Sequence, residues 1–467
     1  MLKTSRVRLV VAFVATSCLL VACGSSSKKS AAPTSAPASA AATIAAPASA
    51  SASAPAVSAS AAAGSSAASV APATPASSSS APPQGKITLT EEDYWGDPAA
   101  DNPGSTAFQN AIKQFESLHP NITINRSQVP YDSMVTKVAL QVTTHAVSDI
   151  VLADNPMTPQ LAATGGFVPL DSLGSIDESA FAAAPLSTGK YNNQLYGLTV
   201  GNNGLAVFYN KTLFAAKNLQ PPATWADLTA DAKALAHGKV AGVEWVGSSQ
   251  EEATWNWEPF LWTAGGTLQN VNTPAGKSAI EFWANLTKDG SAPKSVVTAE
   301  DVSKDFEDGN TAMIIDGSWN LPVFDTTKGL SYGYVPIPTP TAGQAPVTPL
   351  GGEIAMISKS DTAKEQAAFE FVKWFTTTPA VITAFDQAFA YVPALTAAAD
   401  SLVGTDHELS VFRTEFLTGR ARSQDMGTSY YPVSTVAYQQ LQAALLGTVS
   451  PDTALSRMAQ GIAPLLK

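Results

Sequence analysis

The sequence predicts an α/β fold in which helices cover largely parallel sheets. From residue 86 onward, short runs of apolar residues alternate with segments whose apolar residues recur at helical spacing. Glycine, proline and asparagine separate many of these segments. Two strands that are connected through a helix usually lie parallel to each other in one sheet. Ligands of such sheets bind at the carboxyl ends of the strands.

Residues 1–22 predict a secretory signal peptide. Three basic residues lie within the first eight positions, and the apolar run Leu9–Ala22 that follows is too short to span a bilayer comfortably. The run ends in Leu20-Val-Ala-Cys23, which resembles a bacterial lipobox. This implies cleavage before Cys23, a diacylglycerol on its thiol, and a lipid-anchored protein on the extracytoplasmic face of the cell membrane. The alternative is an ordinary secretory signal that contains a cysteine by chance.

Residues 23–85 predict a disordered tether behind that cysteine. Residues 24–84 are almost entirely Ala, Ser, Pro and Thr, which are too small to offset the entropy lost on ordering. As a flexible coil the tether would reach roughly 45 Å, although a mucin-like stalk with its own function is an alternative. Because cleavage would remove Cys18 and leave only Cys23, no disulfide is expected. The fold must then depend on its hydrophobic core.

The charge balance of the folded region excludes some partners. All 38 Asp and Glu residues lie beyond residue 85, whereas five of the 27 Lys and Arg residues precede it. The folded region is therefore strongly acidic. Such a balance argues against nucleic acid and against an anionic membrane surface as partners.

The elements of the first part of the folded region follow one another as strand, helix, strand, helix and strand. Apolar spacing and breaking residues predict them at Ile87–Thr90, around Phe108–Leu118, at Ile122–Ile124, around Val135–Val142 and at Asp149–Leu152. The irregular stretch 91–98 predicts a loop between the first strand and the first helix.

The stretch from Tyr196 to Leu235 organises the rest of the chain. It predicts a strand, a polar break, a second strand, a short helix, a proline stop and a capped helix. In order, these lie at Tyr196–Val200, Gly201-Asn-Asn-Gly204, Leu205–Tyr209, Lys211–Asn218 and Pro221-Pro222. The last helix follows Thr224, which caps it together with Asp227, and runs to Leu235.

This order resembles the extracellular solute-binding proteins of ABC importers, in particular the sugar-binding family that includes maltose-binding protein. The resemblance covers residues 86–467. It continues in Glu258–Gly266, Phe306-Glu-Asp-Gly-Asn-Thr-Ala-Met313, Asp316-Gly-Ser-Trp319, Tyr334–Pro338 and Gly351-Gly-Glu353.

The resemblance implies a two-lobed periplasmic-binding-protein-like fold of type II, in which each lobe is a mostly parallel sheet flanked by helices. Lobe I would comprise residues 86–202 and 353–405, and lobe II residues 206–350 and 408–467, with three hinge crossovers between them. The implied function is capture of a mono- or oligosaccharide in the cleft between the lobes. A monomer would then deliver the sugar to the membrane permease of an ABC transporter, without a cofactor.

The sequence offers few signals for catalysis or for a metal. It has no Gly-x-Ser-x-Gly elbow, phosphate loop or dinucleotide fingerprint. Ser187-Thr-Gly-Lys190 and Ser318-Trp-Asn320 match two short motifs of penicillin-recognising enzymes, but the third motif is missing. Its four histidines lie far apart, so no metal site is expected. An exported carbohydrate-active hydrolase and a binding protein for a non-sugar solute remain alternatives.

Aromatic side chains are the best candidates for ligand contact. The C–H faces of a sugar stack on flat rings, while its hydroxyls pair with carboxylates, amides and backbone groups. By the resemblance Trp319, just after a strand, stacks on a sugar ring, and Trp255 or Trp257 supplies a second platform, since residues two apart on a loop or strand share a side. Further candidates are Tyr94, Trp95 and Tyr131. For each tryptophan the alternative is a core position.

The polar candidates follow from the same resemblance. Asn203 matches a hydrogen-bond acceptor of the family's ligand cleft. Ala153 takes the place of a stacking tryptophan in the maltose-binding relative, and Asp154 and Asn155, which begin the loop after that strand, are expected to hydrogen-bond the ligand instead. Glu353 lies at the second crossover, next to Gly352, whose backbone freedom permits close approach to a ligand. Tyr431 would close one end of the cleft.

Overall fold

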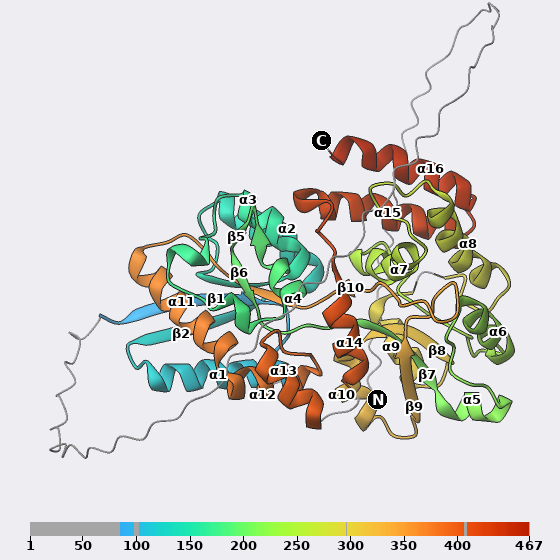
Figure 1. Cartoon of the computed structure of the whole chain (residues 1–467), viewed down its shortest axis with the longest axis horizontal. Coiled ribbons are helices and arrows are strands. Elements are labelled where there is room, and N and C mark those ends of the chain that lie inside the picture. The colour runs from blue at the N-terminus through green and yellow to red at the C-terminus, as the bar shows by residue number, and fades with distance from the viewer. Residues whose placement is uncertain (1–84, 98–101, 296, 406–408, 467) are drawn as a thin grey trace, which may run out of the picture. The chain divides into compact units, whose positions relative to one another are not determined.

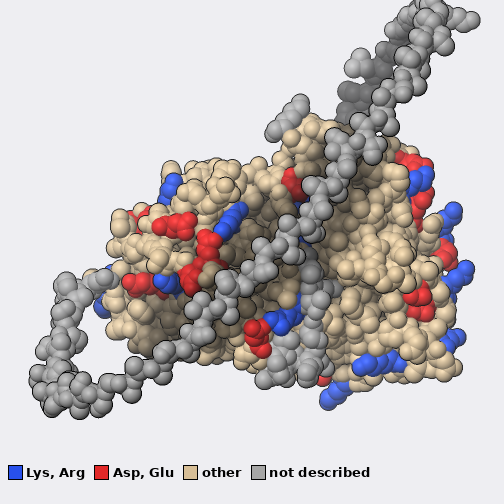
Figure 2. Space-filling model, in the orientation of Figure 1, with Lys and Arg blue, Asp and Glu red and all other residues tan. Residues whose placement is uncertain are grey.

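The computed structural model describes residues 85–97, 102–295, 297–405 and 409–466. The predicted signal peptide 1–22, Cys23 and the tether up to residue 84 lie outside these residues. Within them, no helix is both long enough and apolar enough to cross a membrane. Figure 2 shows acidic and basic side chains interspersed over the visible face, without a large basic patch.

Lobe I is the part of the structure built on a five-stranded sheet with the order β2-β1-β3-β11-β6 (Figure 1). Its strands are β1 (Ile87–Asp93), β2 (Ile122–Gln128), β3 (Ile150–Asp154), β6 (Gly197–Thr199) and β11 (Glu353–Ile357). β1 runs parallel to β2 and β3, whereas β11 runs antiparallel to β3 and β6. The register of β11 on β3 places Glu353 opposite Asp154.

Helices cover this sheet and supply its aromatic core. They are α1 (Pro103–Leu118), α2 (Tyr131–Thr143), α3 (Thr158–Ala163), α4 (Ala183–Thr188), α11 (Thr362–Thr377), α12 (Pro379–Phe389) and α13 (Thr396–Thr405). Phe108 of α1 packs against Phe371 and Phe375 of α11, which fixes both helices on the sheet. Asn102 starts α1 by accepting a hydrogen bond from the Ser105 amide.

Short elements connect these helices and strands. They are the 3₁₀ turns at Asn155–Met157, Leu170–Ser172 and Glu178–Ala180, and the strands β4 (Lys190–Tyr191) and β5 (Gln194–Leu195). Asn192 and Asn193 both have positive φ between β4 and β5, as a tight two-residue hairpin turn requires.

Lobe II is the part built on the three-stranded sheet β8-β7-β9. β7 (Leu205–Asn210) lies between β8 (Met313–Gly317) and β9 (Tyr332–Pro336) and runs antiparallel to both. Residues 241 and 244 extend the sheet through isolated parallel bridges to residues 311 and 314. The predicted alternation of strands and helices is therefore found, but the expected mostly parallel sheet is wrong for lobe II and holds in lobe I only for β1 to β3.

Helices pack around the sheet of lobe II (Figure 1). They are α5 (Lys211–Lys217), α6 (Trp225–Leu235), α7 (Glu251–Thr263), α8 (Pro274–Lys288), α9 (Ala299–Glu307), α10 (Leu321–Thr326), α14 (Ser410–Thr418), α15 (Tyr430–Leu445) and α16 (Pro451–Ile462). The last two, α15 and α16, form a layer beside α7 and α8. The remaining elements are the 3₁₀ turns Ser318–Asn320, Gly427–Ser429 and Ala463–Leu466, and the strands β10 (Pro349–Leu350) and β12 (Arg420–Ala421), which pair in parallel.

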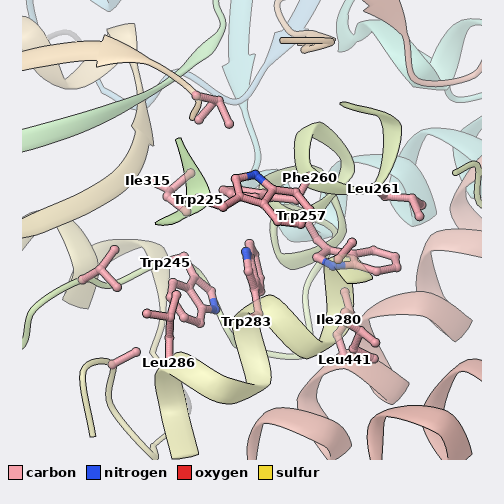
Figure 3. Close-up of a cluster of buried hydrophobic side chains, with 14 of the residues drawn as sticks. Trp225, Trp245, Trp257, Phe260, Leu261, Ile280, Trp283, Leu286, Ile315 and Leu441 are labelled. Atoms are coloured by element: carbon pink, nitrogen blue, oxygen red, sulfur yellow. The ribbon is translucent and has the colours of Figure 1, made fainter. Parts of the chain in front are cut away.

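Tryptophans form the centre of the lobe II core (Figure 3). Trp245 packs on Trp283 with ring centroids 4.5 Å apart, and Trp257 and Trp283 are fully buried. Trp225 begins α6, and the predicted pair of Thr224 and Asp227 forms a reciprocal capping box in front of it. This core holds α6, α7 and α8 against the sheet.

Two of the predicted crossovers lie side by side. The segment 201–204 leads from β6 to β7, and residues 351–352 lead into β11. The amides of Asn203 and Gly351 each donate to the other's carbonyl, at 3.4 and 3.1 Å. Gly352 has a φ of 110°, and a Cβ there would lie 2.1 Å from the Gly201 carbonyl oxygen, so glycine is required. The third predicted crossover, 405–408, falls almost wholly outside the described residues.

Candidate functional site

A cavity of about 240 Å³ lies beside the paired crossovers. Its wall combines side chains of lobe I with side chains of lobe II, so the cavity opens between the two lobes. Most of the ligand residues expected from the sequence line it. These are Tyr94, Tyr131, Asp154, Asn203, Trp255, Trp319, Gly352 and Glu353, joined by Glu252, Phe389 and Tyr391, which sequence reasoning missed.

Two stacked tryptophans form the lobe II side of the cavity. Trp255 comes from α7 and Trp319 from the 3₁₀ turn that follows β8. Their ring centroids lie 5.2 Å apart with planes inclined by 27°. Gly317 makes the position of Trp319 possible, because a Cβ at residue 317 would lie 1.8 Å from the indole ring. The pair presents a rigid aromatic surface to anything in the cavity.

Glu353 is the most deeply held carboxyl group of the lining. Its residue is 2% exposed. The Tyr94 and Tyr391 hydroxyls donate to its Oε1 at 2.9 and 3.3 Å, while Oε2 accepts no hydrogen bond. Burial raises the pKa of Glu353 to about 7, although the tyrosine hydroxyls oppose the rise. Asn203 adds a second buried acceptor, Oδ1, which has no hydrogen-bond partner in the part of the chain that the structure describes.

Arg422 lies directly behind the lining and joins the two lobes. Its guanidinium pairs with Asp154 at the end of β3 and with Glu251 of α7, the latter at 3.0 Å. The guanidinium carbon also lies 4.9 Å from the centre of the Trp255 ring. Arg422 is 2% exposed. Burial disfavours its charge, but the two carboxylates outweigh this and raise the pKa of Arg422.

Tyrosine hydroxyls complete the environment of this ion pair. Tyr131 donates to Asp154 Oδ2 at 2.9 Å, and Tyr430 donates to Glu251. Burial raises the pKa of Asp154, and the nearby Arg422 opposes the rise. The sequence contained no signal for Arg422, because its partner Asp154 is 268 positions away.

Residues 110–409 match the family described as bacterial extracellular solute-binding protein. The matched segment includes every described strand between β2 and β11 and all the cavity-lining residues except Tyr94. This chain belongs to that family.

Relatives of this solute-binding protein include a putative binding protein of Brucella abortus, 26% identical over 272 residues that cover 55% of this chain and 66% of the relative. A maltooligosaccharide ABC transporter solute-binding lipoprotein of Streptococcus pneumoniae is 26% identical over 296 residues, covering 59% of this chain and 66% of that protein. The chain thus spans just under two thirds of the length of these relatives.

Solved structures match the solute-binding protein over more of its length. The cyclic alpha-maltosyl-1,6-maltose binding protein of Arthrobacter globiformis has a TM-score of 0.68 at 27% identity, over 82% of this chain and all of that one. A solute-binding protein of Thermotoga lettingae, bound with alpha-D-tagatose, has a TM-score of 0.73 at 21% identity over 82% of this chain and all of that one. These likenesses confirm the predicted two-lobed α/β fold.

Two predicted ligand tryptophans of the solute-binding protein lie in the hydrophobic core instead. Trp257 is fully buried, and the expected loop or strand around it is the helix α7. Residues two apart on a helix are turned about 200° from each other, so Trp255 and Trp257 face opposite sides. Trp95 packs 5.0 Å from Phe108 and 5.0 Å from Phe385. Neither Trp95 nor Trp257 lines the cavity, which corrects both predictions.

Asn155 and Tyr431 lie next to the cavity without lining it. The Asn155 amide donates to the Leu350 carbonyl at 3.1 Å, which ties β3 to the second crossover. Tyr431 begins α15, and its hydroxyl lies 3.5 Å from Asp154 Oδ2. It lines a neighbouring hollow that shares Tyr131 with the cavity. We therefore place both residues in the support of the site.

The Ser-x-x-Lys motif does not bring its serine and lysine together in the structure. The Ser187 hydroxyl donates to the Ala184 carbonyl, and Lys190 pairs with Glu178 at 2.5 Å, so no serine–lysine pair forms. Among the described residues no group of His, Cys, Asp and Glu side chains could hold a metal ion.

Proposed function

We propose that this protein captures a mono- or oligosaccharide in the cavity between its lobes and delivers it to the membrane permease of an ABC importer. One observation carries the proposal. The stacked pair of Trp255 and Trp319 lines the same cavity as Asn203 and Glu353, each of which has a buried oxygen without a hydrogen-bond partner among the described residues. A sugar supplies both an apolar C–H face for the rings and hydroxyls for these acceptors.

The names of the relatives support the same ligand class. The Streptococcus pneumoniae relative is named for a maltooligosaccharide, and the Arthrobacter globiformis protein is named for cyclic alpha-maltosyl-1,6-maltose. We further propose that the protein has no enzymatic activity and acts as a monomer. We place lobe I at residues 86–202 and 353–405, and lobe II at residues 206–350 and 408–467.

A glycan panel tests this function. The purified protein is mixed with mono- and oligosaccharides, the melting temperature is recorded, and the sugars are recovered for analysis of their reducing ends. We expect at least one sugar to raise the melting temperature, since a ligand that binds the folded state stabilises it, and to be recovered intact. New reducing ends would identify a hydrolase. Stabilisation only by non-sugar solutes would identify a different class of ligand.

We also propose that Cys23 carries a lipid that holds the protein on the extracytoplasmic face of the cell membrane. The family supports an extracytoplasmic location, and the lipobox supports the anchor. In cells that produce the full chain, the Cys23→Ala variant should appear in the medium, because one lost lipid attachment removes the membrane affinity. Retention of Cys23→Ala in the membrane fraction at the wild-type level would contradict the anchor.

A further inference from the structure

The charged side chains that line the cavity are all acidic. They are Asp154, Glu252 and Glu353, and no lysine, arginine or histidine accompanies them among the described lining residues. Arg422 lies in the layer behind, where it is shared between Asp154 and Glu251. One guanidinium therefore serves two carboxylates, and the groups that the described residues place on the Glu353 carboxyl are neutral: the hydroxyls of Tyr94 and Tyr391 and the indole of Trp95.

Among the described residues no lysine, arginine or histidine forms an ion pair with Glu353. Its Oε1 accepts hydrogen bonds from Tyr94 and Tyr391, whereas the buried Oε2 has no hydrogen-bond partner among the described residues. Asp386, fully buried on α12, also has two carboxyl oxygens without partners. Burial raises the pKa of Asp386, and the charge of Glu353 raises it further. A buried carboxylate needs either a proton or a cation beside it.

The rest of the cavity wall is suited to a cation. Tyr94 and Tyr131 meet edge to face with centroids 5.1 Å apart, and Phe389 stacks on Tyr391 at 5.1 Å. Together with the two tryptophans, these rings line the same cavity as Glu353. Aromatic faces attract ammonium groups through their negative quadrupole, and cages of such rings recognise them.

We propose that the sugar bound in this cavity carries a protonated amino group, and that this ammonium binds Glu353 inside the ring of aromatic side chains. The proposal rests on the proposed function and specifies the class of sugar. A neutral sugar could donate its hydroxyls to the same protein acceptors equally well. It would, however, leave the negative charge of the carboxylates around Glu353 without a counterion.

The pH dependence distinguishes the two kinds of sugar. Burial and the charge of Asp154 raise the pKa of Glu353 to about 7, while Tyr94, Trp95 and Tyr391 lower it; Asp386 is the other acidic group that faces it. An ammonium binds the ionised carboxylate, so its affinity is lost as the pH falls through the pKa of Glu353. At alkaline pH the amino group itself loses its proton, so binding is strongest between the two pKa values. We expect at least a tenfold loss between about pH 7 and pH 5.

Titration calorimetry with glucosamine, N-acetylglucosamine and glucose tests the proposal on the full mature chain. The three sugars share one ring, and only glucosamine carries an ammonium. We expect glucosamine to bind at least tenfold more tightly than the other two near neutral pH, and to lose this advantage at acidic pH. The same comparison applies to short oligosaccharides with free or acetylated amino groups.

Two variants complete the test. Glu353→Gln keeps the size of the side chain and should abolish the preference for glucosamine. Glu244→Gln is the matched control: Glu244 is 4% exposed, burial raises its pKa to about 8, and it does not line the cavity. It should leave the preference unchanged. If Glu353→Gln fails to fold, the pH profile of the wild-type protein decides.

The possible outcomes separate this proposal from the proposed function. Equal binding of the three sugars, or a preference for neutral ones, overturns the ammonium and leaves sugar binding intact. If tetramethylammonium binds tightly and no sugar in the panel binds, the ligand is not a sugar, and both proposals are overturned. A glucosamine preference that persists in Glu353→Gln also overturns the assignment of the ammonium to Glu353.

Discussion

Replacing Trp319 with alanine should weaken sugar binding about thirtyfold. The ring lines the cavity and is held flat against Trp255, so its removal deletes one aromatic face of the site. Truncation of a tryptophan at the centre of a binding surface costs on the order of 2 kcal/mol or more, and each 1.4 kcal/mol changes affinity about tenfold. Because the ring is only partly buried, the melting temperature should change much less than the affinity.

Calorimetry and thermal melting of the same variant check this result. Trp245→Ala is the matched control, because Trp245 is 5% exposed and packs on Trp283 in the lobe II core. It should lower the melting temperature strongly, as removal of a core aromatic side chain costs about 3–5 kcal/mol. A Trp319→Ala variant with near-normal affinity and a core-like loss of stability would place Trp319 in the core.

Replacing Arg422 with methionine should lower the free energy of unfolding by about 3–5 kcal/mol. Removing one partner of a buried ion pair leaves the other charges desolvated and unpaired, which is the costly way to break such a pair. In this protein Arg422 serves both Asp154 and Glu251. Burial raises the pKa of Asp154, so this group takes up a proton at acidic pH and no longer leaves an unpaired charge in the variant. The free energies of unfolding of the variant and the wild type should therefore lie closer together at acidic pH.

Denaturant unfolding of the variant gives the measurement, with Arg413→Met as the control. Arg413 pairs with Asp400 on the surface, where the two side chains are 30% and 57% exposed. Exposed pairs contribute about 0–1 kcal/mol, so Arg413→Met should be close to the wild type. Equal stability losses in the two variants would mean that the pair joining the lobes contributes no more than a surface contact.

Local signals in the sequence predicted local structure well. Thr224 and Asp227 lie three residues apart and form the capping box of α6, and the apolar run after Gly204 is the buried strand β7. These features depend on side chains within a few residues of one another. Gly352 was also predicted to have special backbone freedom, and its φ of 110° confirms this.

The features that were missed depend on long-range contacts or on burial from all sides. The resemblance implied a helix at Glu258–Gly266, but the first half of α7, around Trp255 and Trp257, was expected to be a loop or a strand. Nearly every residue from Glu251 to Thr263 is buried, so the apolar pattern has no period that could separate a helix from a strand. An apolar strand does not encode its direction, and the antiparallel sheet of lobe II was therefore missed. Arg422 meets Asp154 only because two lobes come together in the folded chain.

Small-angle scattering of residues 86–467, with and without the sugar that binds best in the glycan panel, tests the central claim most directly. Ligand bound between two lobes should draw them together by a hinge at the paired crossovers. We expect the radius of gyration to fall when the site is saturated with sugar. The sugar concentration that gives half of this change should match the dissociation constant measured by calorimetry. Saturated binding with an unchanged radius of gyration would contradict capture of the sugar by closure of the lobes.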